Sequence, residues 1–149
     1  VASAKRAPRL VLLGDGPERA ALEALAGDLN ISGRVEFRGY LNEPWPAYEQ
    51  AKMLALSSRT EAFGNVLVEA LGHGLPVVAT RCGGPEEVLR NGLDGALVAV
   101  GDVDGMAAAI DAALSDPGDP APRRARAEMF SLDRALDRFE ALIAEVARP

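Results

Sequence analysis

The sequence predicts an α/β protein built on a doubly wound parallel sheet with helices on both faces. Apolar runs bounded by glycines alternate with helical patterns along the 149 residues, which is typical of parallel strands joined by helices. At 48% hydrophobic residues, a chain of this length is expected to fold around one core. The predicted strands are residues 10–13, 34–38, 53–57, 76–80 and 96–100.

The helices are predicted from apolar residues that recur every three or four positions. The first begins at Pro17, a residue suited to the first turn, and others span about 103–114 and about 131–146. The apolar stripe of the first helix consists of Leu22, Leu25, Ala26 and Leu29.

Three regions follow from this pattern. Residues 1–114 form the α/β domain, residues 115–130 form a Pro-rich link with a short helix, and residues 131–149 form an amphipathic helix of the same domain.

The segment between Thr60 and Thr80 is the most informative one. It contains Glu61 and Glu69, which bracket the start of a predicted helix with Asn65 as its N-cap. N–H groups in the first turn of a helix have no partner within the helix and favour a phosphate. The N–H groups expected to be free are those of Val66, Leu67 and Val68.

Other candidate residues follow the predicted strands. Ligands of open parallel sheets bind at the carboxyl ends of the strands, where strand-to-helix loops and helix N-termini meet. Gly14 and Gly16 follow the first strand, and Arg38 and Gly39 end the second. We therefore expect these residues to share one cleft with the loop from Glu61 to Asn65.

The residues around this segment resemble the donor-binding signature of the retaining family-4 (group 1) glycosyltransferases of the GT-B fold. That signature has two Glu separated by seven residues, with Phe-Gly soon after the first, as in Glu61, Phe63-Gly64 and Glu69. Gly74–Val78 and Gly83-Gly84 extend the resemblance, which covers nearly the whole chain. It implies a Rossmann-like domain, one half of a GT-B fold, that binds a nucleotide-diphosphate sugar as donor substrate.

The resemblance also implies roles for individual residues. Glu61 would contact the donor sugar at the catalytic centre, and Glu69 would accept hydrogen bonds from the ribose hydroxyls. The loop at Arg38 and Gly39 would lie near the base. The full set of implied donor-binding residues is Gly14, Gly16, Arg38, Gly39, Phe63, Gly64, Asn65, Val66, Leu67 and Glu69. The implied reaction is glycosyl transfer with retention, without a metal or other cofactor.

Compared with this family, the chain lacks the first strand–helix unit and the N-terminal acceptor-binding domain. We therefore expect the 149-residue chain to be inactive alone. The missing strand would leave a gap beside residues 10–13. Upstream residues, a strand from a second chain, or closure of the neighbouring strands would fill that gap. The apolar stripe of the C-terminal helix offers a second route to self-association.

Two other functions remain open from the residues alone, a sugar-nucleotide epimerase of similar architecture and a non-catalytic flavodoxin-like binding or regulatory module. A glycosidase also uses two carboxylates, but a helix N-terminus between them suits a diphosphate leaving group. Arg19 stands where a dinucleotide fingerprint needs its third glycine, which disfavours NAD. Asp102 is expected to cap a helix rather than bind a metal, and His73 is expected to pack at a helix end.

Composition excludes several other classes. A net charge of −6 makes nucleic acid an improbable partner, and the run Arg123-Arg124 with Arg126 is expected in a solvated turn. Cys82 is the one cysteine, so no internal disulfide forms. No apolar stretch approaches membrane-spanning length. We expect a cytoplasmic protein, with peripheral attachment of the full-length enzyme to a membrane left open.

Overall fold

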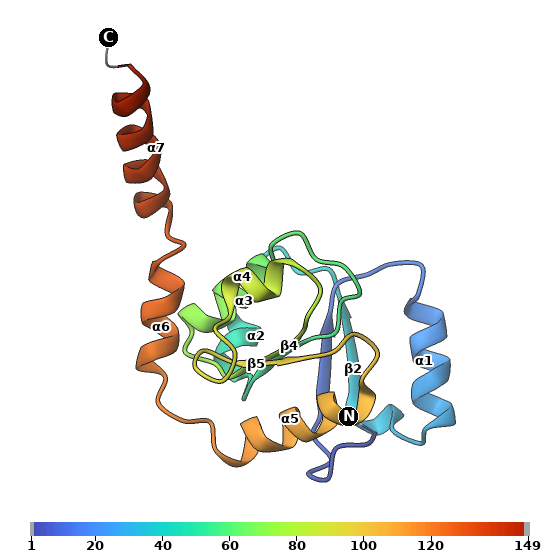
Figure 1. The fold of residues 1–149 in the computed structure, drawn as a ribbon. Helices are drawn as coiled ribbons and strands as arrows, with labels where there is room; N and C mark the ends of the chain where they lie inside the picture. The colour runs from blue at the N-terminus through green and yellow to red at the C-terminus, as the bar shows by residue number, and fades with distance from the viewer. Residues whose placement is uncertain (1, 148–149) are drawn as a thin grey trace.

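The computed structural model describes residues 2–147 and confirms the α/β class (Figure 1). The N-terminal elements are β1 (Leu10–Leu13), α1 (Arg19–Asp28), a 3-10 turn (Ser32–Arg34), β2 (Val35–Gly39) and α2 (Trp45–Gln50). The central elements are β3 (Leu54–Leu56), α3 (Asn65–Gly72), β4 (Val77–Thr80), α4 (Gly84–Val88) and β5 (Ala96–Val98). The C-terminal helices are α5 (Val103–Ser115), α6 (Ala121–Glu128) and α7 (Leu132–Val146).

The strands form two parallel sheets, not the single sheet expected from the sequence. β1 pairs with β2, with Leu10 opposite Val35, and the other sheet has the order β3-β4-β5. No ladder joins β1 to β3 among residues 2–147. The break falls beside β1, where the sequence predicted a missing strand.

The core is centred on β4, whose four residues are all buried. Val77 and Ala79 belong to a cluster with Leu67 and Leu71 of α3, and α5 packs against β4 and β5. Because neighbouring side chains of a strand point to opposite faces, full burial of β4 requires cover on both faces. Figure 1 shows α3 above and α5 below these strands.

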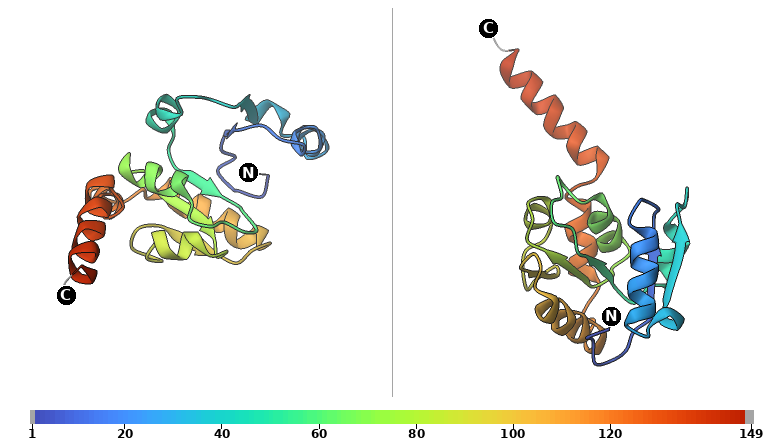
Figure 2. Two further views of the ribbon diagram at one scale, coloured as in Figure 1. Left: turned by 90° about the horizontal axis from the view of Figure 1, so that it is seen from above. Right: turned by 90° about the vertical axis from the view of Figure 1, so that its right-hand side faces the viewer.

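The β1–β2 sheet carries α1 and forms a separate lobe in the left view of Figure 2. The predicted stripe of α1 is covered only in part, since Ala26 is buried but Leu22, Leu25 and Leu29 are exposed. Because no ladder joins β1 to β3 within residues 2–147, the expectation that the neighbouring strands close the gap is wrong. Closure would require the β1–β2 lobe to shift toward β3.

The N-terminal segment opposes such a shift. The N–H groups of Lys5 and Arg6 donate to the Asp111 carboxylate of α5, at 2.7 and 3.1 Å. Ala4 beside them is buried. The segment that leads into β1 is thus tied to a helix that packs on the other sheet. Filling of the gap by upstream residues or by a second chain stays a prediction.

The arginines of the C-terminal link do not lie in a solvated turn, so that expectation is wrong. They lie in α6, where Arg123 is 8% exposed and its Nε donates to the Gly74 carbonyl at 2.8 Å. The Arg126 guanidinium donates to the carbonyls of Val88 and Glu87. Carbonyls at helix ends lack intrahelical hydrogen-bond donors, and the side chains of Arg123 and Arg126 provide those donors here. The basic run therefore fastens α6 to α3 and α4.

The last helix, α7, begins at Ser131, whose side chain accepts a hydrogen bond from the Arg134 N–H. It extends away from the rest of the molecule in Figure 1 and in the right view of Figure 2. None of the helices formed by residues 2–147 has the length and apolar character needed to span a membrane. The exposed apolar residues of α7 are Leu132, Leu136, Phe139, Leu142, Ile143 and Val146.

A buried carboxylate holds the turn before β5. Asp94 is 1% exposed and accepts two hydrogen bonds of 2.8 Å from the Arg90 guanidinium. Arg126 of α6 lies 3.8 Å from the same carboxylate. The hydrogen bonds from Arg90 lower the pKa of Asp94 below the ordinary value of 3.8. Asp94 is therefore a charged group whose ionised form is favoured by the fold.

Asp94→Asn should lower the free energy of unfolding by about 1–3 kcal/mol at pH 7, because a hydrogen-bonded buried charge is lost. The folded pKa of Asp94 is depressed, so its stabilisation is present above the unfolded pKa and is lost as the pH falls through the folded pKa. Urea unfolding from pH 7 down to pH 3 should show the two proteins converging in acid. Asp137→Asn on the exposed face of α7 is the control, expected to change stability by less than about 0.5 kcal/mol. A constant difference across this pH range would contradict the assignment.

Candidate functional site

The carboxyl ends of β1 and β2 bring the first group of candidate residues together. The Gly14 N–H donates to the Gly39 carbonyl at 2.7 Å, and both glycines have positive φ, +116° and +68°. The Arg38 guanidinium pairs with Glu36 at 2.7 Å, and this hydrogen bond raises the pKa of Arg38. A side chain at Gly14 would meet no atom within 4 Å. The loop that contains Gly14 is therefore open to solvent at the place where we expected a ligand from the sequence.

Gly16 lies just beyond this contact, at the start of the approach to α1. Its N–H donates a hydrogen bond to the carboxylate of its neighbour Asp15, at 2.9 Å. Asp15 also lies 3.5 Å from the Arg19 guanidinium, which donates to the Phe37 carbonyl of β2. Arg19, which stands where a dinucleotide fingerprint needs a glycine, thus ties α1 to Phe37 of β2.

The second group begins at Glu61, which the fold holds by its backbone. The Glu61 N–H donates to the Cys82 carbonyl at 3.3 Å, and the Gly84 N–H donates to the Glu61 carbonyl at 2.8 Å. Gly84 packs so closely on the backbone of Phe63 that a Cβ there would overlap it. These backbone contacts, which we call the backbone strap, hold the segment after β3 against the turn after β4. The Glu61 side chain is half-buried.

The helix that follows has its N-cap one residue earlier than predicted. Gly64, not Asn65, is the N-cap, and Asn65 is the first residue of α3. Gly64 has φ +90°, and a Cβ there would lie 2.9 Å from the Leu67 side chain, so glycine suits this position. The Leu67 N–H donates to the Gly64 carbonyl at 2.8 Å. The expectation that Leu67 offers a free N–H is therefore wrong, and the first N–H groups of α3 are those of Asn65 and Val66.

Glu69 lies one turn into α3, as predicted, and has a partner that the sequence did not reveal. The Tyr48 hydroxyl of α2 donates to Glu69 Oε2 at 2.7 Å. Tyr48 is buried, and burial followed by the hydrogen bond to Glu69 raises the pKa of the phenol well above its ordinary value of 10.0. Its ring stacks on His73 with centroids 5.3 Å apart. His73 therefore packs at the end of α3, as the sequence predicted.

Tyr48 could not have been singled out from the sequence, because residues 45–50 form one short helix without a clear apolar period. The available signal was modest. Pro44 and Pro46 favour a helix start, and Trp45 with Tyr48 places two aromatic rings three residues apart on one side of such a helix.

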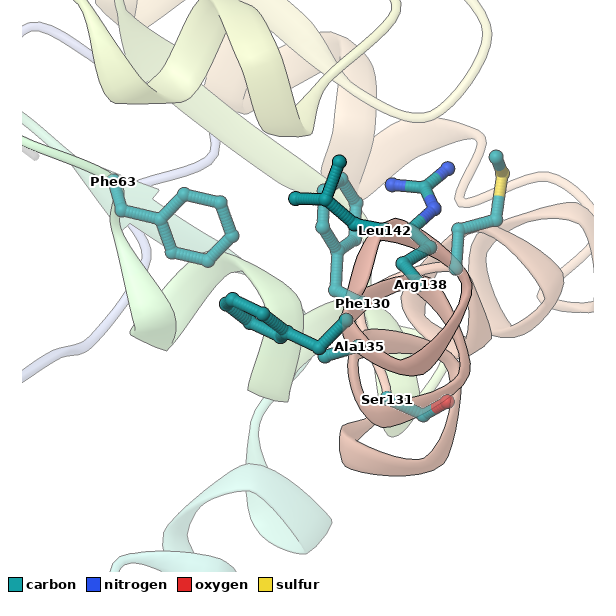
Figure 3. Close-up of a pocket in the computed structure, with 8 residues that line it drawn as sticks. Phe63, Phe130, Ser131, Ala135, Arg138 and Leu142 are labelled. Carbon is teal, nitrogen blue, oxygen red and sulfur yellow. The ribbon is translucent and has the colours of Figure 1, made fainter. Parts of the chain in front are cut away.

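The Phe63 side chain packs against the C-terminal part of the chain. It makes an edge-on contact with Phe130, with ring centroids 5.5 Å apart, and lines an apolar groove beside α7 (Figure 3). Only its backbone is placed beside Gly84. The groove is lined by Phe63, Met129, Phe130, Ser131, Ala135, Arg138, Phe139 and Leu142.

The two groups of candidate residues lie on different sheets. In Figure 1 the chain leaves β1, and runs from β3 to α3, at the upper edge of the molecule, so both groups lie at the carboxyl ends of their strands. No hydrogen bond or ion pair links the two groups within residues 2–147. The two halves of the predicted cleft therefore share one edge of the fold without a hydrogen bond or ion pair between them in the described residues.

Two further expectations concern metals. Asp102 accepts a hydrogen bond from the Gly105 N–H at 2.8 Å and caps α5, as predicted. Within residues 2–147, no group of three or more His, Cys, Asp or Glu side chains is arranged to hold a metal ion.

The sequence and the fold match one class of protein. Residues 1–116 match the family model of the glycosyl transferases of group 1. The chain is 43% identical over 107 residues to the lipopolysaccharide core biosynthesis glycosyltransferase LpsE of Rhizobium meliloti. This match covers 72% of this chain and 32% of LpsE. It is 34% identical over 146 residues to N-acetyl-alpha-D-glucosaminyl L-malate synthase of Bacillus anthracis, covering 94% of this chain and 38% of the relative.

Solved structures agree with the sequence matches. The structure of HepE from Anabaena in complex with UDP-glucose has a TM-score of 0.81 and 27% identity, and the match covers 97% of this chain and 42% of HepE. The apo form of the lipopolysaccharide outer core galactosyltransferase WaaB has a TM-score of 0.82 and 26% identity, covering 92% and 40%. The chain belongs to the group 1 glycosyl transferases, and its fold is the Rossmann-like part of a GT-B enzyme. This membership disfavours the epimerase and the flavodoxin-like module.

Gly84→Ala should displace the Glu61 segment, because the added methyl group overlaps the Phe63 backbone. Overpacking of this kind costs about 1–3 kcal/mol of unfolding free energy. Gly33→Ala is a matched control, since a Cβ at Gly33 meets no atom within 4 Å. Thermal and urea unfolding of the two variants give the comparison. Equal stability of Gly84→Ala and Gly33→Ala would show that the strap between the two loops does not depend on Gly84.

Proposed function

We propose that this chain is the donor-binding part of a glycosyltransferase that moves a glycosyl group from a nucleotide-diphosphate sugar to an acceptor. The observation that carries the proposal is the pairing of two carboxylates with an open helix start. Glu61 is held by its backbone beside the first turn of α3, and Glu69 lies one turn further along the same helix. The chain spans 32%, 38% and 42% of the length of the first three curated relatives, so the whole reaction is proposed for the longer protein.

The names of relatives support a nucleotide sugar as the donor. HepE from Anabaena has been solved with UDP, with UDP and glucose, and with UDP-glucose. A relative in Mycolicibacterium smegmatis, 35% identical over 133 residues, is a GDP-mannose-dependent mannosyltransferase. UDP-sugars and GDP-sugars share the diphosphate and the ribose. We assign the site of this chain to these shared groups and leave the base and the sugar to experiment.

The proposed roles follow from the chemistry of each group. The N–H groups of Asn65 and Val66 at the start of α3 face the diphosphate, where the helix dipole favours negative charge. Glu69 accepts hydrogen bonds from the ribose hydroxyls, because an ionised carboxylate is a strong acceptor. Glu61 contacts the donor sugar. The N–H groups of Asn65 and Val66 stabilise the departing diphosphate, and this stabilisation supplies the main rate enhancement.

The proposal extends to retention at the anomeric carbon, to a hexose as the transferred sugar, and to catalysis without a metal. The spacing of the Glu pair supports retention through its resemblance to retaining enzymes. Transfer also needs an acceptor held in line with the donor. An acceptor-binding domain is therefore the proposed partner of this chain, within a cytoplasmic enzyme.

Glu69→Ala should weaken the binding of UDP or GDP by about tenfold or more, because a hydrogen bond to a charged acceptor contributes about 1.5–3 kcal/mol. Titration calorimetry in EDTA measures both diphosphates with the unaltered chain and with the variant. Glu140→Ala, a carboxylate lost from the exposed face of α7, is the control and should leave the affinity unchanged. Unchanged affinity in Glu69→Ala, or binding that appears only with manganese, would count against the proposal.

Glu61→Ala should distinguish the sugar from the nucleotide. The proposed contact of Glu61 with the sugar predicts about a fivefold loss of affinity for UDP-glucose or GDP-mannose, and less than about a twofold loss for the free diphosphate. Competition titrations of each nucleotide sugar against its diphosphate give both numbers in one experiment. Glu69→Ala should weaken both ligands to the same degree. An equal loss of sugar and diphosphate in Glu61→Ala would place Glu61 elsewhere in the site.

A further inference from the structure

We propose that Tyr48 is a positioning residue of this site, which holds the Glu69 carboxylate in the orientation that receives the ribose hydroxyls. The inference rests on the proposed function, because it concerns the same carboxylate. It adds a residue from α2, a helix that contributes none of the residues predicted from the sequence.

The contact between Tyr48 and Glu69 is directional and spans two elements. The hydroxyl lies 2.7 Å from Glu69 Oε2, and the two residues are 21 positions apart in the chain. Within residues 2–147, Tyr48 is the one hydrogen-bond donor to this carboxylate. One oxygen is therefore engaged by the protein, and the other, Oε1, is left to accept hydrogen bonds from a ligand.

The Tyr48 ring is itself held in place. It is 6% exposed and belongs to the core cluster with Leu67 and Leu71 of α3. His73 stacks on one side at 5.3 Å with an angle of 17° between the planes, and Trp45 lies 6.4 Å away at 32°. The hydroxyl is thus presented to Glu69 by a ring with little freedom of its own.

The hydroxyl is suited to this work because it stays a donor. Burial, and then the hydrogen bond to Glu69, raise the pKa of the phenol, so Tyr48 keeps its proton throughout the neutral range. A glutamate has three rotatable side-chain bonds, and ordering it when a ligand binds costs conformational entropy. A carboxylate that is oriented before binding avoids most of that cost.

A second role of Tyr48, filling the core, must be separated from orientation of Glu69. Tyr48→Phe keeps the ring and removes only the hydroxyl, so it tests orientation. Trp45→Leu does the converse, because it removes a packing neighbour of Tyr48 and leaves the hydroxyl in place.

The experiment measures binding of two ligands by calorimetry. The first is UDP or GDP, whichever the unaltered 149-residue chain binds more tightly, and the second is its 2′,3′-dideoxy counterpart. Tyr48→Phe should weaken the natural diphosphate about three- to tenfold. It should change affinity for the dideoxy compound less than about twofold, because that compound offers Glu69 no hydroxyl. Trp45→Leu should shift both ligands by the same factor.

A double variant completes the test. In the Glu69→Ala background, Tyr48→Phe should have less than about a twofold effect, since the hydroxyl acts through the missing carboxylate. Equal weakening of both ligands by Tyr48→Phe, or an undiminished effect in the Glu69→Ala background, would overturn the positioning role while leaving the donor site standing. Failure of the unaltered chain to bind either diphosphate would overturn the proposed function together with this inference.

Discussion

The backbone strap between the segment after β3 and the turn after β4 is the contact on which the site depends. Two hydrogen bonds join Glu61 to Cys82 and Gly84, and Gly84 packs directly on the backbone of Phe63. Backbone contacts of this kind hold a loop without using its side chains. The Glu61 carboxylate therefore stays available for a ligand, and the loop delivers the chain to Gly64 in the left-handed conformation that starts α3.

α3 links this strap to the rest of the protein. Its buried face, with Leu67 and Leu71, lies on β4, and its Glu69 carboxylate accepts a hydrogen bond from Tyr48. Its C-terminal end is secured by Arg123 of α6, which donates to the Gly74 carbonyl, and by the stack of His73 on Tyr48. A helix held at both ends and along one face is a rigid support for a binding site, which suits interactions that need fixed geometry.

Particular residues show where prediction from the sequence worked and where it did not. The strand at residues 10–13 has the predicted bounds, and the helix with Glu69 lies where its apolar spacing placed it. The cap was assigned to Asn65 because asparagine is a favoured cap, but crowding between Gly64 and Leu67 selects glycine. Arg123 was expected in solvent, since charged residues are usually exposed. It is buried because helix-end carbonyls far away in the chain need donors.

The sequence by itself determined the α/β class, the Glu61 and Glu69 pair beside a helix start, and the resemblance to a glycosyltransferase family. These depend on local spacing, turn residues and motif order, all of which are short-range properties of the chain. Only the tertiary structure decided that the strands divide into two sheets, that Tyr48 binds Glu69, and that Arg123 and Arg126 fasten α6. Each of these depends on groups far apart in the chain, with 18 positions between the paired Val78 and Ala96, 21 between Tyr48 and Glu69, 49 between Arg123 and Gly74, and 38 between Arg126 and Val88. Periodicity carries no information on which distant donor meets which acceptor, because that pairing is set by how the elements pack.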